Sequence, residues 1–120
     1  MVLLRTRFSV SDNSGAKTAD CIRLVGPHTR PSIGSLFLIS IHQLRHKQKV
    51  TKGTLHFAIL VEKKQKECRM DGSSYRCSRN SVVLLTRSLQ PIGTRILGLV
   101  PYEVRQAGFM KLLSLGTHTL

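Results

Sequence analysis

The residues of this chain that could ligate a metal or act as nucleophiles are three cysteines and five histidines. The cysteines are Cys21, Cys68 and Cys77, and their spacing contains no CxxC pair of the kind that structural zinc sites use. Cys68 and Cys77 straddle a predicted hairpin turn and could face each other across it, but no second pair follows. We therefore predict no metal site and no cofactor. The odd cysteine count also argues against a disulfide framework.

The carboxylates offer little for acid–base catalysis. Asp12 and Asp71 fall in predicted turns, where Asp is a structural choice. Glu62, Glu67 and Glu103 have basic neighbours, and we expect them to be solvated. No histidine is spaced with an acid and a serine as a triad requires, and no glycine-rich phosphate-binding motif is present. The sequence therefore predicts that the protein is not an enzyme.

Cations carry the strongest signal, because 19 Lys and Arg against 6 Asp and Glu give a formal charge of +13. An imbalance of this size destabilises a compact chain through self-repulsion unless a polyanion neutralises it. Segments 45–52 and 63–79 hold ten cations and flank one strong predicted strand, so both can converge on one side of a barrel. The candidate nucleic-acid contacts are Arg45, Lys47, Lys49, Lys52, Lys63, Lys64, Lys66, Arg69, Arg76 and Arg79.

Nucleic acid fits this charge better than a membrane does. Neutralising phosphates releases counterions and favours binding. The chain has no basic amphipathic helix and no apolar run near the roughly 20 residues that span a bilayer. Aromatic residues make up only 5% of the chain, which disfavours a platform for stacking single-stranded bases. We therefore expect recognition of the backbone and shape of folded RNA.

Short apolar runs separated by turn residues predict a mainly β fold. The runs "RFSV", "KTADCIRLV", "SLFLISIHQL", "TLHFAILVE" and "SVVLL" read as strands, and five or six such strands indicate a small β-barrel. Asp71-Gly72 predicts a hairpin turn whose arms are too polar to be buried, so a β-ribbon should project at about residues 62–79. Helical spacing interrupted by Gly108 predicts two short helices within about residues 102–116. We expect one domain, residues 1–120.

Seven further stretches agree in order and spacing with a known family. With them the chain resembles the universal large-subunit ribosomal protein L-fourteen family, nearly from end to end. The pair "PIGTRI" and "FMK" is the most specific part. The stretches are "VSDNSGAK", "CIRLVG", "KVTKG", "DGSSYR", "NSVVLL", "QPIGTRILG" and "FMKLLSL".

The resemblance implies a five-stranded β-barrel with a projecting β-ribbon and two short C-terminal helices. It implies a structural constituent of the large ribosomal subunit that binds large-subunit rRNA. It further implies a place at the intersubunit face, beside ribosomal proteins L-three and L-nineteen, with a bridge to small-subunit rRNA. In bacteria and mitochondria a ribosome silencing factor docks on this family, and the resemblance implies a docking surface that includes Thr94, Arg95 and Lys111.

The stretch "PIGTRILG" places one arginine among small and apolar residues. Gly93 and Gly98 would permit a tight, exposed backbone path, from which Arg95 projects towards an anionic or polar partner. The alternative is that Arg95 only reaches solvent from a strand edge, with its stem on apolar surface.

Departures from the family pattern indicate the compartment. The family usually has "GD" where this chain has Gly34-Ser35 and Gly53-Thr54, and an aromatic residue where Cys77 stands. These changes favour an organellar protein, in the mitochondrial matrix, with a bacterial cytoplasm or a plastid as alternatives.

A second hypothesis for function is a free basic RNA-binding module that regulates translation outside the ribosome.

Overall fold

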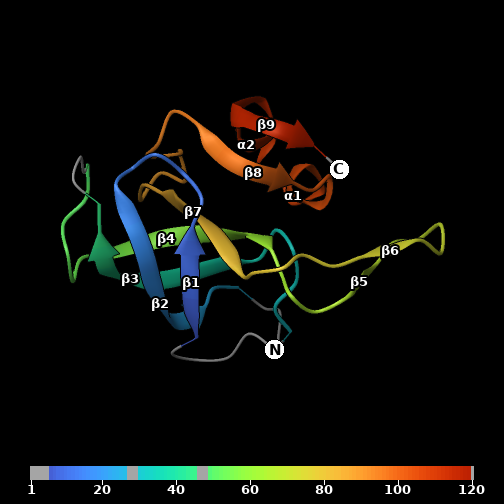
Figure 1. Cartoon of the computed structure of the whole chain (residues 1–120), viewed down its shortest axis with the longest axis horizontal. Coiled ribbons are helices and arrows are strands. Elements are labelled where there is room, and N and C mark those ends of the chain that lie inside the picture. The colour runs from blue at the N-terminus through green and yellow to red at the C-terminus, as the bar shows by residue number, and fades with distance from the viewer. Residues whose placement is uncertain (1–5, 27–29, 46–48, 120) are drawn as a thin grey trace.

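Five strands form a closed barrel in the computed structural model, which describes residues 6–26, 30–45 and 49–119. The order around the barrel is β1-β2-β3-β4-β7, and β7 closes it by pairing antiparallel with β4 and parallel with β1 (Figure 1). This confirms the predicted mainly β fold and its five-stranded barrel. The strands are β1 (Arg7–Val10), β2 (Ala16–Leu24), β3 (Leu36–Leu44), β4 (Leu55–Glu62) and β7 (Ser81–Leu85).

The barrel interior is built from the predicted apolar runs. Phe8 and Val10 of β1 are both buried, as their alternate positions predicted. The ring of Phe8 packs at 5.4 Å from that of Phe37, and aliphatic side chains fill the rest of a chain that has no tryptophan. Gly15 has a φ of 99°, which lets the predicted "DNSGA" turn join β1 to β2.

Strand β7 is buried on both of its faces. Successive residues of a strand point to opposite faces, yet Val82, Val83 and Leu84 are all inaccessible to solvent. One face lines the barrel. The C-terminal part of the chain covers the other and contributes Val100 and Leu112 to the same apolar cluster (Figure 1).

This C-terminal cover contains the two predicted short helices and two strands. Gly108, with a φ of 96°, separates the helices, as predicted. A parallel pair of strands, β8 and β9, brackets them, and β9 was not predicted. No helix in the described part of the chain is long and apolar enough to cross a membrane. The elements are β8 (Ile96–Val100), α1 (Glu103–Gln106), α2 (Met110–Leu115) and β9 (Gly116–Thr119).

The predicted ribbon is present, with β5 (Glu67–Cys68) paired to β6 (Ser74–Tyr75), and it projects from the barrel (Figure 1). At its tip the Asp71 carboxylate accepts hydrogen bonds from the backbone and hydroxyl of Ser73, at 2.9 and 2.6 Å. The ribbon register places Cys68 opposite Ser74, whereas the Cys77 amide donates to the carbonyl of Lys63. The two cysteines therefore do not face each other, although their positions in the sequence allowed it.

Candidate nucleic-acid interface and docking surface

The two basic segments lie at opposite ends of β4, so they do not come together as the sequence allowed. Segment 45–52 precedes β4, and the ribbon follows it (Figure 1). The strand has 8 residues, which separates its ends by about 26 Å. Both segments flank the same strand, but the strand's length holds them apart. A polyanion that touches both must therefore be an extended one.

The described cations of the first segment form no ion pair with a described residue. The loop is fastened by its backbone, because the amides of Arg45 and Lys49 donate to carbonyls of the β1–β2 turn at 2.7 Å. The side chains of Arg45, Lys49 and Lys52 stay exposed, and none forms an ion pair within residues 6–26, 30–45 and 49–119. Lys47 lies outside the described residues.

Half of the ribbon's cations are paired with carboxylates. Lys63 is buried, and its Nζ lies 2.6 Å from the Glu67 carboxylate. Arg79 is exposed but lies 3.3 Å from the carboxylate of Glu62, which is 7% exposed. The expectation that Glu62 is solvated was therefore wrong. It rested on the basic neighbours of Glu62 in the sequence, whereas the folded chain buries the residue.

The third paired cation, Arg69, fastens the ribbon to α1. Its Nε donates to Glu103 Oε1 at 2.9 Å, and the Tyr75 hydroxyl donates to Glu103 Oε2 at 2.9 Å. The guanidinium also lies 4.7 Å from the centre of the Tyr75 ring, a cation–π contact. We call Arg69, Tyr75 and Glu103 the ribbon clamp. The side chains of Glu103 and Glu67 are only partly exposed, so the expectation that they are solvated was also wrong.

The electrostatics of the ribbon clamp match its geometry. Burial acts to raise the pKa of Glu103. A backbone hydrogen bond and the contacts with Arg69 and Tyr75 outweigh burial, so the pKa lies below its ordinary value. Burial, and then the hydrogen bond to Glu103, raise the pKa of the Tyr75 phenol. Glu103 is therefore charged and Tyr75 neutral at neutral pH, as the observed hydrogen bonds require.

Six of the ten predicted contacts remain free for a ligand. All six are exposed, and none forms an ion pair with any described residue. Three lie on the loop and three on the ribbon, and we call these groups the loop cations and the ribbon cations. The loop cations are Arg45, Lys49 and Lys52, and the ribbon cations are Lys64, Lys66 and Arg76.

Asn13 holds the stretch that carries Thr94 and Arg95. Its side-chain oxygen accepts the amides of Thr94 and Arg95, at 2.7 and 3.1 Å, and its Nδ2 donates to the Thr94 hydroxyl at 2.8 Å. A Cβ on Gly93 would lie 2.7 Å from that oxygen, so only glycine allows this approach. A Cβ on Gly98, whose φ is 94°, would crowd Glu62 and Arg79. The backbone is fixed while the Arg95 side chain stays exposed.

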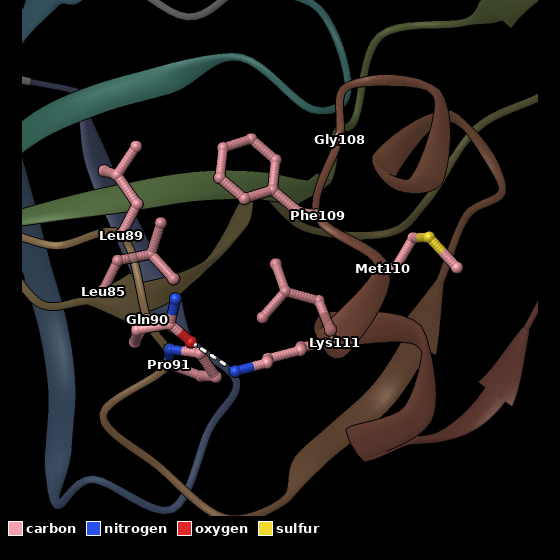
Figure 2. A pocket seen from close by; sticks show the side chains of 9 residues that line it. Leu85, Leu89, Gln90, Pro91, Gly108, Phe109, Met110 and Lys111 are labelled. Atoms are coloured by element: carbon pink, nitrogen blue, oxygen red, sulfur yellow. Dashed lines mark hydrogen bonds between the residues drawn. The ribbon is translucent and has the colours of Figure 1, made fainter.

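Lys111 is tied to the same stretch of chain. Its Nζ donates to Gln90 Oε1 at 2.7 Å, and Gln90 opens the sequence "QPIGTRILG". Beside this contact lies a groove of about 210 Å³, with Leu89 and Pro91 on one wall and Phe109 on the other (Figure 2). Leu89 has a φ of 63°, which is uncommon for a residue with a branched side chain and marks local strain.

Fold and surface together define a small, strongly basic β-barrel protein with free cations at both ends and no group of three metal-ligating side chains in its described part. The family model described as ribosomal protein L14p/L23e matches residues 1–120. The chain therefore belongs to this family of large-subunit ribosomal proteins, a structural and non-enzymatic class. The resemblance drawn from the sequence is confirmed.

The roles of two residues, Asn13 and Tyr75, were not predicted from the sequence. Asn13 read only as a turn residue, because nothing local shows that its side chain reaches a loop more than 80 positions along the chain. Tyr75 read as part of a polar ribbon arm. Its signal is an aromatic residue beside a tight turn, but its partner Glu103 lies in a different element.

Proposed function

We propose that this chain binds large-subunit rRNA through the loop cations and the ribbon cations. The observation that carries the proposal is that these six side chains are exposed and form no ion pair with a described residue. Arg suits bidentate contact with a phosphate, and Lys acts as a point charge. Two groups separated by the length of β4 suit the shape of folded RNA.

The test measures how the affinity for a folded large-subunit rRNA fragment depends on salt. Replacing Lys64, Lys66 and Arg76 by Ala should lower the slope of log K against log salt by about 2–3, since each phosphate contact contributes about 0.7–0.9. The matched control replaces three exposed cations elsewhere, Lys17, Arg30 and Arg105, and changes the charge equally. Equal slopes for the two variants would show that only total charge matters.

The finer place in the ribosome is part of the same proposal. We infer that the protein lies at the intersubunit face beside ribosomal proteins L-three and L-nineteen and contributes a bridge to small-subunit rRNA. The fixed backbone at residues 93–95, together with the exposed Arg95, supports a role in contacting a partner. Co-sedimentation at high salt tests this directly. Stoichiometric presence in large subunits is expected, whereas a free RNA-binding regulator of translation would wash off.

We also propose that Thr94, Arg95 and Lys111 form a docking surface for a ribosome silencing factor. The support is that Asn13 fixes the first two residues, and Gln90 holds the third. An organellar setting, in the mitochondrial matrix, fits the departures from the family pattern. Fluorescence from a tagged copy in intact cells would test the compartment, and signal outside mitochondria would overturn that part.

A further inference from the structure

A second apolar groove lies on the outer surface of the barrel, where β3, β4 and β7 meet. It has a volume of about 320 Å³. In the strand register Leu38 of β3 stands opposite Phe57 of β4, and Phe57 stands opposite Leu85 of β7. One aromatic ring thus sits between two leucines in a single row across the sheet. The residues that line the groove are Leu38, Leu55, His56, Phe57, Leu85 and Arg87.

The groove is open because the C-terminal cover stops short of it. Further along β4, Ile59 stands opposite Val83, and both are buried. Towards the start of β4, Phe57 is partly exposed and Leu55 is 58% exposed. This end of β4 adjoins the segment that carries the loop cations (Figure 1). An apolar surface is therefore left uncovered next to a basic loop.

One cation lines this groove, and two more lie close to its lining residues in the sheet or along the chain. Arg87 lines it, Arg23 of β2 stands opposite Leu38 in the sheet, and Lys52 lies three positions before Leu55. All three are exposed, and within the described part of the chain none forms an ion pair. Among the described residues, no carboxylate lines the groove. An apolar slot with cations beside it matches a nucleotide, whose base is flat and whose phosphates are anionic.

His56 supplies a polar group at the edge of the groove. Its Nε2 lies 3.0 Å from the Thr54 hydroxyl, and Nδ1 has no partner among the described residues. Burial lowers the pKa of the imidazole, so the ring is neutral at neutral pH. A neutral ring can donate to or accept from the edge of a base, depending on its tautomer.

We propose that this groove binds one unstacked base of the rRNA, which stacks on Phe57 while Arg87, Arg23 and Lys52 contact the flanking phosphates. Sequence-specific proteins commonly take unstacked RNA bases on aromatic side chains. The inference rests on the proposed rRNA binding and adds a base contact to the phosphate contacts. A protein partner fits less well, because it would need an acidic surface to complement these cations, whereas every stretch of RNA supplies phosphates.

The experiment compares two six-nucleotide RNA probes on the whole protein. One is oligo(A), and the other is the same ribose-phosphate chain without bases. We expect oligo(A) to bind about 5- to 150-fold more tightly, the range for one stacked base. Phe57→Leu should reduce this ratio to near one, while Phe57→Tyr should keep it. Because Phe57→Leu preserves apolar bulk, an unchanged melting temperature will separate lost stacking from lost folding.

The two proposals fail in different ways. Substituting the ribbon cations should weaken both probes equally and leave their ratio intact. Equal binding of the two probes by the native protein, or a ratio unaffected by Phe57→Leu, would overturn the base site while rRNA binding stands. Loss of large-subunit assembly in Phe57→Leu with an unchanged ratio would indicate a protein partner at the groove, and would also overturn the base site. A salt-independent affinity for folded rRNA would overturn the proposed function itself.

Oligo(A) titration followed by NMR adds a spatial readout. The Leu38 and Leu55 methyl groups, which line this groove and not the one beside Lys111, should shift upfield under the ring current of a bound base. The Met110 methyl, at the other groove, is the internal control and should not move. Shifts of Met110 equal to those of Leu38 would overturn the assignment to this groove.

Discussion

The loop carries four of the predicted cations and the ribbon six, and the two segments use them differently. The described loop cations all face solvent without partners, whereas the ribbon pairs Lys63, Arg69 and Arg79 with carboxylates. The two segments differ because carboxylates lie within reach of the ribbon's cations. Glu62 and Glu67 are local to the ribbon, but Glu103 comes from a helix more than thirty positions away. A count of positive charge therefore overestimates how much of a basic segment is available to RNA.

The largest expected effect comes from breaking the ribbon clamp. Glu103→Ala leaves Arg69 and the Tyr75 hydroxyl without their shared acceptor, and hydrogen bonds to charged groups contribute about 1.5–3 kcal/mol. We expect a loss of that order in the free energy of unfolding, measured by denaturant melts, and faster hydrogen exchange in β5 and β6. Lys49→Ala in the loop is the control and should stay within about 0.5 kcal/mol. Equal losses would remove the contrast between loop and ribbon.

The same clamp should give the ribbon a dependence on pH that the loop lacks. The pKa of Glu103 is lowered in the fold, so its stabilisation is complete above the unfolded value of about 4.5 and is lost as pH falls through the folded pKa. The stability difference between the native protein and Glu103→Gln should therefore be constant near neutral pH and shrink in acid.

Asp71 and Asp12 titrate in both the native protein and Glu103→Gln, so their contributions cancel in the stability difference between the two. Contacts with Ser73 lower the pKa of Asp71, whereas burial raises that of Asp12, so their contributions have opposite signs. A stability difference that grew in acid would contradict the assignment of a charged Glu103 to the clamp.

The smallest effect on stability is expected at the docking surface. Arg95→Ala and Lys111→Ala should change the free energy of unfolding by no more than about 0.5 kcal/mol. Each should weaken silencing-factor binding or subunit joining by about 1–2 kcal/mol, roughly 5- to 30-fold, since interface arginines often act as anchors. Asn13→Ala is the structural control and should lower the melting temperature. A large drop in the melting temperature of Arg95→Ala, with normal subunit joining, would show that Arg95 stabilises the fold instead of contacting a partner.

The sequence predicted the barrel, the ribbon and the two helices because their signals are local. Alternating apolar residues, Asp71-Gly72 and Gly108 each act within a few positions. Strand β9 was not predicted, because "GTHT" has little apolar content and because its pairing with β8 depends on the helices that fold between the two strands.

The site was predicted only in part for the same reason. Exposed cations can be counted from sequence, but the partners of Lys63, Arg69 and Arg79 depend on the tertiary fold. The position of segment 45–52 relative to the ribbon depends on the length and direction of β4. The partial exposure of Phe57 depends on where the C-terminal cover ends, and an apolar run alone does not show which of its residues stay uncovered.

The central claim is that free cations bind rRNA while paired cations hold the ribbon. Two variants of equal charge test it on a folded large-subunit rRNA fragment: Lys64, Lys66 and Arg76 to Gln, against Lys63, Arg69 and Arg79 to Gln. We predict that the first lowers the salt slope by about 2–3 with an unchanged melting temperature, and that the second lowers the melting temperature with little change in slope. Equal losses of slope in the two variants would contradict the claim.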